Sequence, residues 1–193
     1  IVIRAAEALR QARGVTAGAV ITLEKHLPHA AGIGSGSSDA AAALRVLASI
    51  WDVDPLPPSA NDVLALGADV PVCLRGPAPI RMSGIGEVLS EAPALPDCAL
   101  VLINPRVDVP TAAIFSGLKT KTNRAMDSIP ADMDFDAFAD WLAQQRNDMM
   151  PPAIAVAPEI GAVLDRLGKV SGVEIAGMSG SGATCFGLMR SMA

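Results

Sequence analysis

Histidine is scarce in this chain of 193 residues, which contains only His26 and His29. Two imidazoles argue against a histidine-based metal cluster and against a hydrolase triad. Cysteine is also scarce: Cys73, Cys98 and Cys185 are far apart and form neither a CxxC pair nor a zinc-binding spacing. Widely spaced cysteines in odd number are typical of buried thiols in a reducing cytoplasm. The sequence therefore predicts a cytoplasmic protein with no metal site made of histidine or cysteine.

Long hydrophobic runs and a surplus of positive charge are both missing. No apolar run approaches the roughly 18 residues of a membrane span, and no secretory signal pattern is present, so we expect no membrane association. The net charge of −5 argues against a nucleic-acid partner, because such proteins usually carry a basic surplus. A site for a small anion needs only a local positive potential and is not excluded. The chain begins without Met, inside a predicted helix, and is expected to lack its true N-terminal segment.

Hydrophobic periodicity and turn residues predict a mixture of helices and strands, with residues 119–133 as an irregular loop. The expected helices run from the start of the chain to a C-cap at Gly14 and over about 37–51, 60–66, 111–118, 134–146 and 157–168. The expected strands lie at about 18–25, 70–75 and 98–104, with a hairpin over 78–93 and a strand–turn–strand unit over 171–189.

The stretch PHAAGIGSGSSDAAAALRVL, residues 28–47, places three glycines directly before a predicted helix. A helix N-terminus has unpaired N–H groups and about +0.5 of an elementary charge, so it attracts anions. Glycines let the backbone approach such an anion closely, because no Cβ stands in the way. The serines add hydroxyls that can bond phosphate oxygens. This pattern predicts a cradle for a di- or triphosphate, with Lys25 either neutralising phosphate or lying on a strand edge.

Two common phosphate loops do not fit this stretch. A Walker P-loop needs a lysine after its glycines, and none follows. The dinucleotide fingerprint GxGxxG fails because Ser37 or Asp39 stands at its third glycine. A plain glycine-rich turn with Ser37 as N-cap stays an alternative. A second turn in GMSGSGATCFGL, residues 177–188, offers another nest of N–H groups, although it also suits a tight strand connection. Together the two turns favour a shared phosphate site.

The motif PHAAGIGSGSSDAA resembles the second motif of the GHMP small-molecule kinases, and MSGSGATCFGL resembles their third. The segments LGADVPVCLRG, GIGEVL, NPRVDVPTAAIF and RNDMMPPA follow in the right order and are similar to one group within that family, which acts in non-mevalonate isoprenoid synthesis. The resemblance implies an α+β, two-lobed fold with mixed sheets, helices packed on one side and the active site between the lobes. It assigns residues 1–96 to the remainder of an ATP-binding N-terminal lobe and 97–193 to the C-terminal lobe.

The resemblance also implies an activity, which is the phosphorylation by ATP, with Mg²⁺, of the 2-hydroxyl of a methylerythritol linked to cytidine diphosphate. By position in the motifs, Asp69 of GADVP is the catalytic residue that accepts or orients the hydroxyl proton. Thr111 and Phe115 lie near the substrate, with the phenyl ring stacked on the base. Either Ser37 or Ser38 reaches Mg²⁺. The ATP-binding residues implied are Pro28, His29, Ala30, Ala31, Gly32, Ile33, Gly34, Ser35, Gly36, Ser37 and Ser38. The turn expected on the phosphate side consists of Ser179, Gly180, Ser181 and Gly182.

The chain departs from the family pattern in four respects. Ser35 stands where a third consecutive glycine is common. The first family motif, the N-terminal lysine that pairs with the catalytic aspartate, and the residues that hold the cytosine from the N-terminal side have no counterpart here. Two other functions stay open: a different GHMP kinase, of mevalonate or homoserine type, and a nucleotide-binding protein of the same fold without turnover. For Asp69 the alternative is a structural one, a cap of the turn before Val70 and Pro71.

Overall fold

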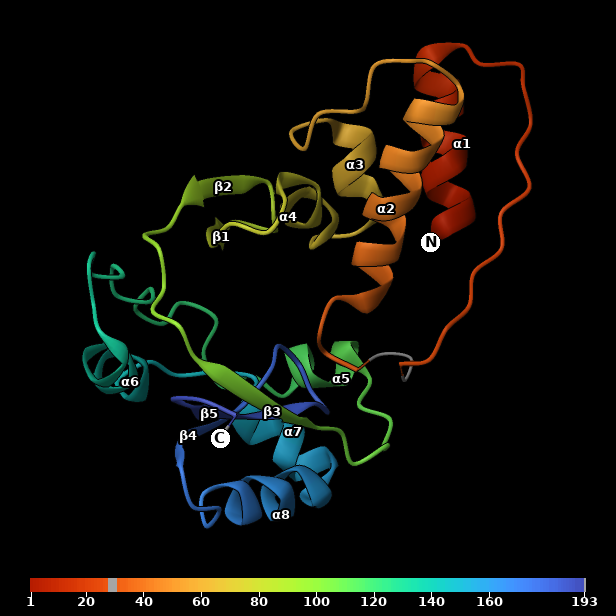
Figure 1. Ribbon diagram of the computed structural model, residues 1–193. Helices are drawn as coiled ribbons and strands as arrows, with labels where there is room; N and C mark the ends of the chain where they lie inside the picture. The colour runs from red at the N-terminus through yellow and green to blue at the C-terminus, as the bar shows by residue number, and fades with distance from the viewer. Residues whose placement is uncertain (28–30, 193) are drawn as a thin grey trace. The chain divides into compact units, whose positions relative to one another are not determined.

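The described residues of the computed structural model are 1–27 and 31–192, and they form two units (Figure 1). Unit 1 contains Ile1–Leu27 and Gly34–Ala92, whereas the described part of unit 2 is 31–33 and 93–192. The glycine-rich loop therefore begins in one unit and ends in the other. Three of its predicted ATP-binding residues, Pro28, His29 and Ala30, lie outside the described residues. The expected lobe boundary after residue 96 stays a prediction.

Unit 1 packs four helices into one apolar core and adds a hairpin. Its elements are α1 (Val2–Arg13), α2 (Ser35–Ile50), α3 (Asn61–Leu66), α4 (Val70–Arg75), β1 (Ile80–Ser83) and β2 (Val88–Glu91). Leu9 of α1 and Leu44 of α2 are buried together in the core with Val63 and Val70. The left-handed Gly14 ends α1 with its N–H bonded to the carbonyls of the last turn, which confirms the predicted C-cap. The antiparallel β1–β2 pair confirms the predicted hairpin.

Two predicted strands of unit 1 are wrong. Residues 18–25 alternate in polarity, but they have no partner strand among the described residues, and Val20 is 98% exposed. Residues 70–75 form the helix α4 instead of a strand. Pro71 lies in its first turn, where the missing N–H costs nothing, whereas in a central strand it would remove a ladder hydrogen bond. The glycines Gly67 and Gly76 bound this short helical segment.

Unit 2 is built on a three-stranded sheet in the order β3–β5–β4. Its elements are β3 (Ala99–Ile103), α5 (Thr111–Ser116), α6 (Phe135–Ala143), α7 (Met150–Val156), α8 (Pro158–Leu167), β4 (Val173–Met178) and β5 (Cys185–Met189). All the strand pairs described are antiparallel, so the expected mixed sheets are not found. The short turn between β4 and β5 explains the antiparallel direction of that pair, because parallel neighbours need a long crossover. The strands expected at 98–104 and within 171–189 are confirmed, as is the strand–turn–strand connection.

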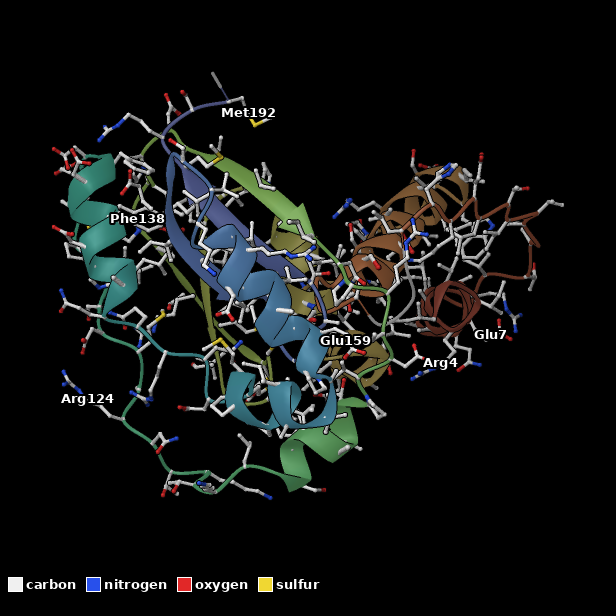
Figure 2. The ribbon with its side chains drawn as sticks, turned by 90° about the horizontal axis from the view of Figure 1, so that it is seen from below. Arg4, Glu7, Arg124, Phe138, Glu159 and Met192 are labelled. Atoms are coloured by element: carbon white, nitrogen blue, oxygen red, sulfur yellow. The ribbon has the colours of Figure 1, made fainter. Side chains whose placement is uncertain are left out.

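Helices cover both faces of this sheet, whereas the sequence analysis expected them on one side. Helices α7 and α8 pack with Met178 and Cys185, while α6 packs with Ile175 and Leu188 through residues that include Phe138. Successive strand residues point to opposite faces, so both faces are apolar and both attract helices. Figure 2, which labels Phe138, shows α6 beside the sheet and α8 running across it.

The remaining differences are small. Helix α7 was not predicted; two prolines in its first turn, Pro151 and Pro152, suit a helix start but hide it from a search for periodicity. Cys98 is exposed, contrary to the expectation of three buried thiols, whereas Cys185 is buried and Cys73 half-buried. Within the described part of the chain, no helix combines the length and the apolar character needed to cross a bilayer.

Candidate functional site

Helix α2 begins at a glycine in the left-handed conformation. Gly34 is the N-cap, with φ of 65°, and its carbonyl accepts a hydrogen bond of 2.9 Å from the N–H of Ser38. None of the described side chains caps this helix. The alternative in which Ser37 is the N-cap is wrong, because Ser37 lies inside the first turn. The first-turn N–H groups, which have no partner within a helix, point out of the end of a helix of 16 residues. This end suits an anion.

Asp69 lies beside that glycine. A Cβ built on Gly34 would stand 3.6 Å from Oδ2 of Asp69 and 4.0 Å from its Cβ. Asp69 occupies the N-cap position of α4, yet its side chain accepts no capping hydrogen bond. The structural alternative, in which the carboxylate caps the turn, is therefore not supported. The carboxylate faces the start of α2 instead.

The segment that carries Asp69 is held closely on two sides. A Cβ on Gly67 would lie 3.8 Å from Oγ of Ser37, so the segment runs along the first turn of α2. On the other side, a Cβ on Gly86 would overlap the carbonyl of Ala68. The turn between β1 and β2 is thus in close backbone contact with Ala68, the residue before Asp69. The ordinary contact at Gly67 and the close approach at Gly86 place this segment beside the helix end.

Lys25 supplies a positive charge at the same helix end. Its ammonium group forms an ion pair with Asp39 and lies 3.3 Å from Oγ of Ser35. The side chains of Lys25 and Asp39 are 19% and 28% exposed, so this pair is largely shielded from water. Of the two interpretations left open from the sequence, the strand edge is wrong because no strand forms there. The ammonium group of Lys25 is paired with Asp39, and neutralisation of phosphate by Lys25 stays a prediction.

In unit 2 the serine–glycine turn of residues 179–182 packs against the first part of the glycine loop. The hydroxyl of Ser179 donates a 2.8 Å hydrogen bond to the carbonyl of Gly32, and the N–H of Thr184 donates one of 3.2 Å to Ala31. A Cβ on Gly32, which has φ of 72°, would stand only 2.7 Å from the carbonyl oxygen of Ser179. Only glycine fits that position without a shift. The two motifs are therefore in direct contact.

Thr111 joins the same turn. It is the first residue of α5, and its Oγ1 lies 3.2 Å from Oγ of Ser181, within hydrogen-bond distance. The structure thus brings together a predicted substrate residue and the predicted phosphate-side turn, which are 70 residues apart. Asn147, which sequence reasoning missed, also touches this turn with two hydrogen bonds to its backbone. The segment RNDMMPPA was the only signal for it.

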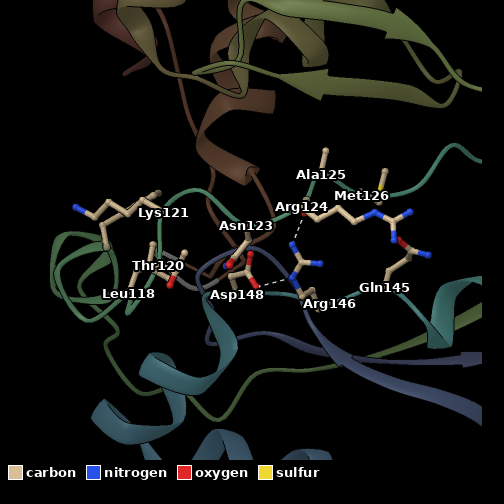
Figure 3. A pocket seen from close by; sticks show the side chains of 11 residues that line it. Leu118, Thr120, Lys121, Asn123, Arg124, Ala125, Met126, Gln145, Arg146 and Asp148 are labelled. Carbon is tan, nitrogen blue, oxygen red and sulfur yellow. Dashed lines mark hydrogen bonds and ion pairs between the residues drawn. The ribbon is translucent and has the colours of Figure 1, made fainter.

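Phe115 lies one helical turn beyond Thr111 and is 50% exposed. It lines a pocket of about 410 Å³. Figure 3 shows this pocket, with Arg146 beside Asp148. Within that pocket Arg146 donates to Asp148 through Nε at 2.9 Å and also to the carbonyl of Arg124. Hydrogen bonds from Asn123 and Arg146 lower the pKa of Asp148. An exposed aromatic face beside a polar pocket suits stacking of a nucleobase.

The described residues contain no group of three or more carboxylate, imidazole or thiol side chains that could hold a metal ion by themselves. Mg²⁺ in phosphate-transferring sites keeps several waters and takes one or two carboxylates together with substrate phosphates. The serine hydroxyls in the first turn of α2 are oxygen ligands of the kind that such a metal accepts. A role of Ser37 or Ser38 toward Mg²⁺ stays a prediction.

Comparisons with known proteins give consistent results. The family model described as the GHMP kinases N terminal domain matches residues 1–77. A curated relative from Ruegeria pomeroyi is 52% identical over 99% of this chain and 66% of its own length, and one from Jannaschia sp. is 54% identical over 90% and 60%. Both are named 4-diphosphocytidyl-2-C-methyl-D-erythritol kinase.

A solved structure is similar as well. A crystal structure of 4-(cytidine 5'-diphospho)-2C-methyl-D-erythritol kinase aligns with a TM-score of 0.73 at 33% identity, over 96% of this chain and 67% of the other. The chain spans 60% to 66% of the length of the two curated relatives above.

Proposed function

Because the chain belongs to the GHMP kinase family, we propose that it transfers the γ-phosphoryl group of ATP to the 2-hydroxyl of 4-diphosphocytidyl-2-C-methyl-D-erythritol. The observation that carries this proposal is the carboxylate of Asp69 beside the glycine-led start of α2. The names of the relatives at 52% and 54% identity support the choice of substrate.

The glycine loop and α2 bind the triphosphate in this proposal. Phosphoryl transfer proceeds through a loose transition state whose charge is spread over the phosphoryl oxygens, so catalysis depends on positioning and on fixed positive potential. The N–H groups at Gly34–Ser37 and the helix dipole supply that potential without reorganisation. Ser35 and Lys25 add a hydroxyl and a cation at the same end. The ATP-binding role of residues 28–38 stays a prediction for each residue.

Asp69 orients the acceptor hydroxyl and takes its proton. A carboxylate can accept a hydrogen bond from an alcohol and take its proton. Oδ2 of Asp69 lies 3.6 Å from the position of a Cβ on Gly34. An alcohol bound to this carboxylate would therefore lie within reach of a phosphate bound at the glycine loop. Mg²⁺, when bound with ATP, neutralises developing charge on phosphate oxygens. Either Ser37 or Ser38 would hold it on the protein side.

Thr111 and Phe115 bind the cytidyl part of the substrate in the proposal. The exposed ring of Phe115 offers one face to the base, and the hydroxyl of Thr111 is held at the turn by Ser181. We also propose a location in the reducing cytoplasm, as expected from the cysteine usage.

The test is an assay of the purified gene product that contains this chain, with ATP and a panel of alcohols. We expect ADP release with the cytidyl substrate and none above background with mevalonate or homoserine. Turnover of mevalonate or homoserine would identify a different GHMP kinase. ATP binding without ADP release from any alcohol, under conditions in which a curated relative is active, would favour a non-catalytic nucleotide-binding protein.

A further inference from the structure

We infer that Asn147 is a positioning residue for the phosphate-binding loop: it fixes the serine–glycine turn, and the turn fixes Gly32. This inference rests on the proposed function and assigns a role to a residue outside the predicted site. Asn147 lies between α6 and α7 and contacts neither of the predicted substrate residues through a described hydrogen bond.

The side chain of Asn147 uses both of its N–H donors and its carbonyl oxygen. Its Nδ2 donates to the carbonyl of Met178 at 2.9 Å and to the carbonyl of Gly180 at 2.8 Å. Its Oδ1 accepts from the N–H of Met149 at 3.0 Å. An amide with both donors and its acceptor engaged has one orientation, because a flip would set an oxygen against two carbonyls.

The two carbonyls that Asn147 holds flank Ser179 in the chain. Ser179 is therefore fixed from both sides, and its own N–H donates to the carbonyl of Thr184 at 2.9 Å. From this fixed position its hydroxyl reaches the carbonyl of Gly32 at 2.8 Å. The order of contacts is thus Asn147 to the turn, and the turn to the glycine loop.

The contact at Gly32 has little tolerance for displacement. A Cβ there would already be 2.7 Å from the carbonyl of Ser179, so the two backbones are as close as glycine allows. Gly32 is itself one of the residues expected to bind the triphosphate, and it belongs to the same unit as Ser179. A shift of Ser179 would therefore displace the peptide groups of this part of the loop, which are expected to contact phosphate. An amide side chain is needed for this, since only its NH₂ group can donate to two carbonyls at once while its oxygen binds a third partner.

Asn104 provides a matched control in the same unit. Its Nδ2 donates to Oγ1 of Thr184 at 2.9 Å, and its Oδ1 accepts from the N–H of Arg106 at 2.7 Å. Replacing Asn104 by Asp is tolerable because the hydroxyl of Thr184 can rotate and donate to the new carboxylate. Replacing Asn147 by Asp is not, because the two carbonyls cannot donate. The same substitution is therefore disruptive at one position and conservative at the other.

The experiment compares Asn147→Asp with Asn104→Asp in the gene product that contains this chain. Affinities for ATP and for adenosine are measured by calorimetry, and kcat and KM are measured with the cytidyl substrate. We expect Asn147→Asp to weaken ATP binding by about tenfold while adenosine affinity changes less than about twofold. Asn104→Asp should leave both affinities unchanged. A merely structural role would change the affinities for ATP and for adenosine to the same extent, so the difference between the two losses is the decisive measurement.

Ser179→Ala and Ser179→Thr keep the inference testable if Asn147→Asp does not fold. The alanine variant loses only the hydroxyl bond to Gly32 and should weaken ATP binding by about threefold to tenfold, whereas threonine should restore it. Unchanged ATP affinity in both Asn147→Asp and Ser179→Ala would overturn the inference, as would equal losses for ATP and adenosine. If the unsubstituted protein itself binds no ATP, the proposed function fails instead.

Discussion

Gly34 and Asp69 face each other across the start of α2. The distance from Oδ2 of Asp69 to a Cβ built on Gly34 is 3.6 Å, which is ordinary van der Waals contact. The space in front of the helix end is thus bounded on one side by the carboxylate. A phosphate bound by the first-turn N–H groups would lie near a group able to accept a proton. Changes at the carboxylate and at the glycine should therefore affect turnover and nucleotide binding separately.

Replacing Asp69 by Asn should abolish most turnover while ATP still binds. The amide keeps the shape of the carboxylate but cannot take the proton of the substrate hydroxyl, so kcat should fall by about 10²- to 10⁴-fold. The free energy of unfolding should change by less than about 0.5 kcal/mol, because the side chain caps nothing. Turnover measured alongside calorimetric ATP affinity checks both parts. Near-normal kcat would remove Asp69 from the mechanism.

A side chain at Gly34 should weaken ATP binding beyond its effect on folding. Gly34→Ala places a methyl group where phosphate is expected, next to the carboxylate of Asp69. Gly14→Ala is the control, since Gly14 has a φ of 64° against 65° at Gly34 but open space around it. Left-handed backbone costs an alanine about 1–2 kcal/mol at either position, so both variants should lose similar stability. Denaturant unfolding and ATP titration of the pair separate strain from binding; equal ATP affinity in both variants would refute the cradle.

The reactivity of Cys73 reports the charge of Asp69 without any assay of turnover. Burial raises the pKa of the Cys73 thiol, and the negative charge of Asp69 raises it further. Asp69→Asn removes the second contribution, so the pKa of Cys73 should fall and its alkylation by iodoacetamide at mildly alkaline pH should accelerate. Asp62→Asn, in the first turn of α3, is the control and should not change the rate.

Site-resolved mass spectrometry distinguishes Cys73 from the exposed Cys98, and Cys98→Ser can serve as the background for all variants. If Cys73 is alkylated in that background at the same rate with and without the Asp69→Asn substitution, the carboxylate does not face this part of α4.

The sequence was sufficient to predict the features that depend on neighbouring residues. The alanine-rich run after the glycines predicted α2. The turn glycines between β1 and β2 and between β4 and β5 predicted these two hairpins. The prediction for residues 70–75 was wrong because VPVCL reads as an apolar strand unless Pro71 is taken as a first-turn residue. Residues 18–25 were also wrongly predicted as a strand, because alternating polarity does not make a strand without a partner strand.

The contacts between distant residues could not be predicted from periodicity. Ser179 and Gly32 are 147 residues apart, and their motifs were linked only by their similar composition and by the resemblance to GHMP kinases. For Asn147 the sequence offered only the family-like segment RNDMMPPA and no hint of a role, because that role depends on the carbonyls of Met178 and Gly180 much later in the chain. The pairing of Lys25 with Asp39 needs the intervening chain to bring both to one helix end. Such arrangements follow from packing of the whole unit, not from local propensity.

Removing the ring of Phe115 should raise the KM for the cytidyl substrate and leave the KM for ATP unchanged. The ring is half-exposed at the edge of the 410 Å³ pocket, so one face is free to stack on a base. Stacking of one base on an aromatic side chain contributes about 1–3 kcal/mol, which corresponds to a rise in KM of about fivefold to 150-fold for Phe115→Ala. Phe115→Tyr keeps the ring and should behave like the unsubstituted protein. The exposed position makes a large loss of stability unexpected in either variant, and thermal unfolding checks this. An effect confined to ATP would contradict the assignment, because the ring would then belong to the nucleotide donor and not to the acceptor.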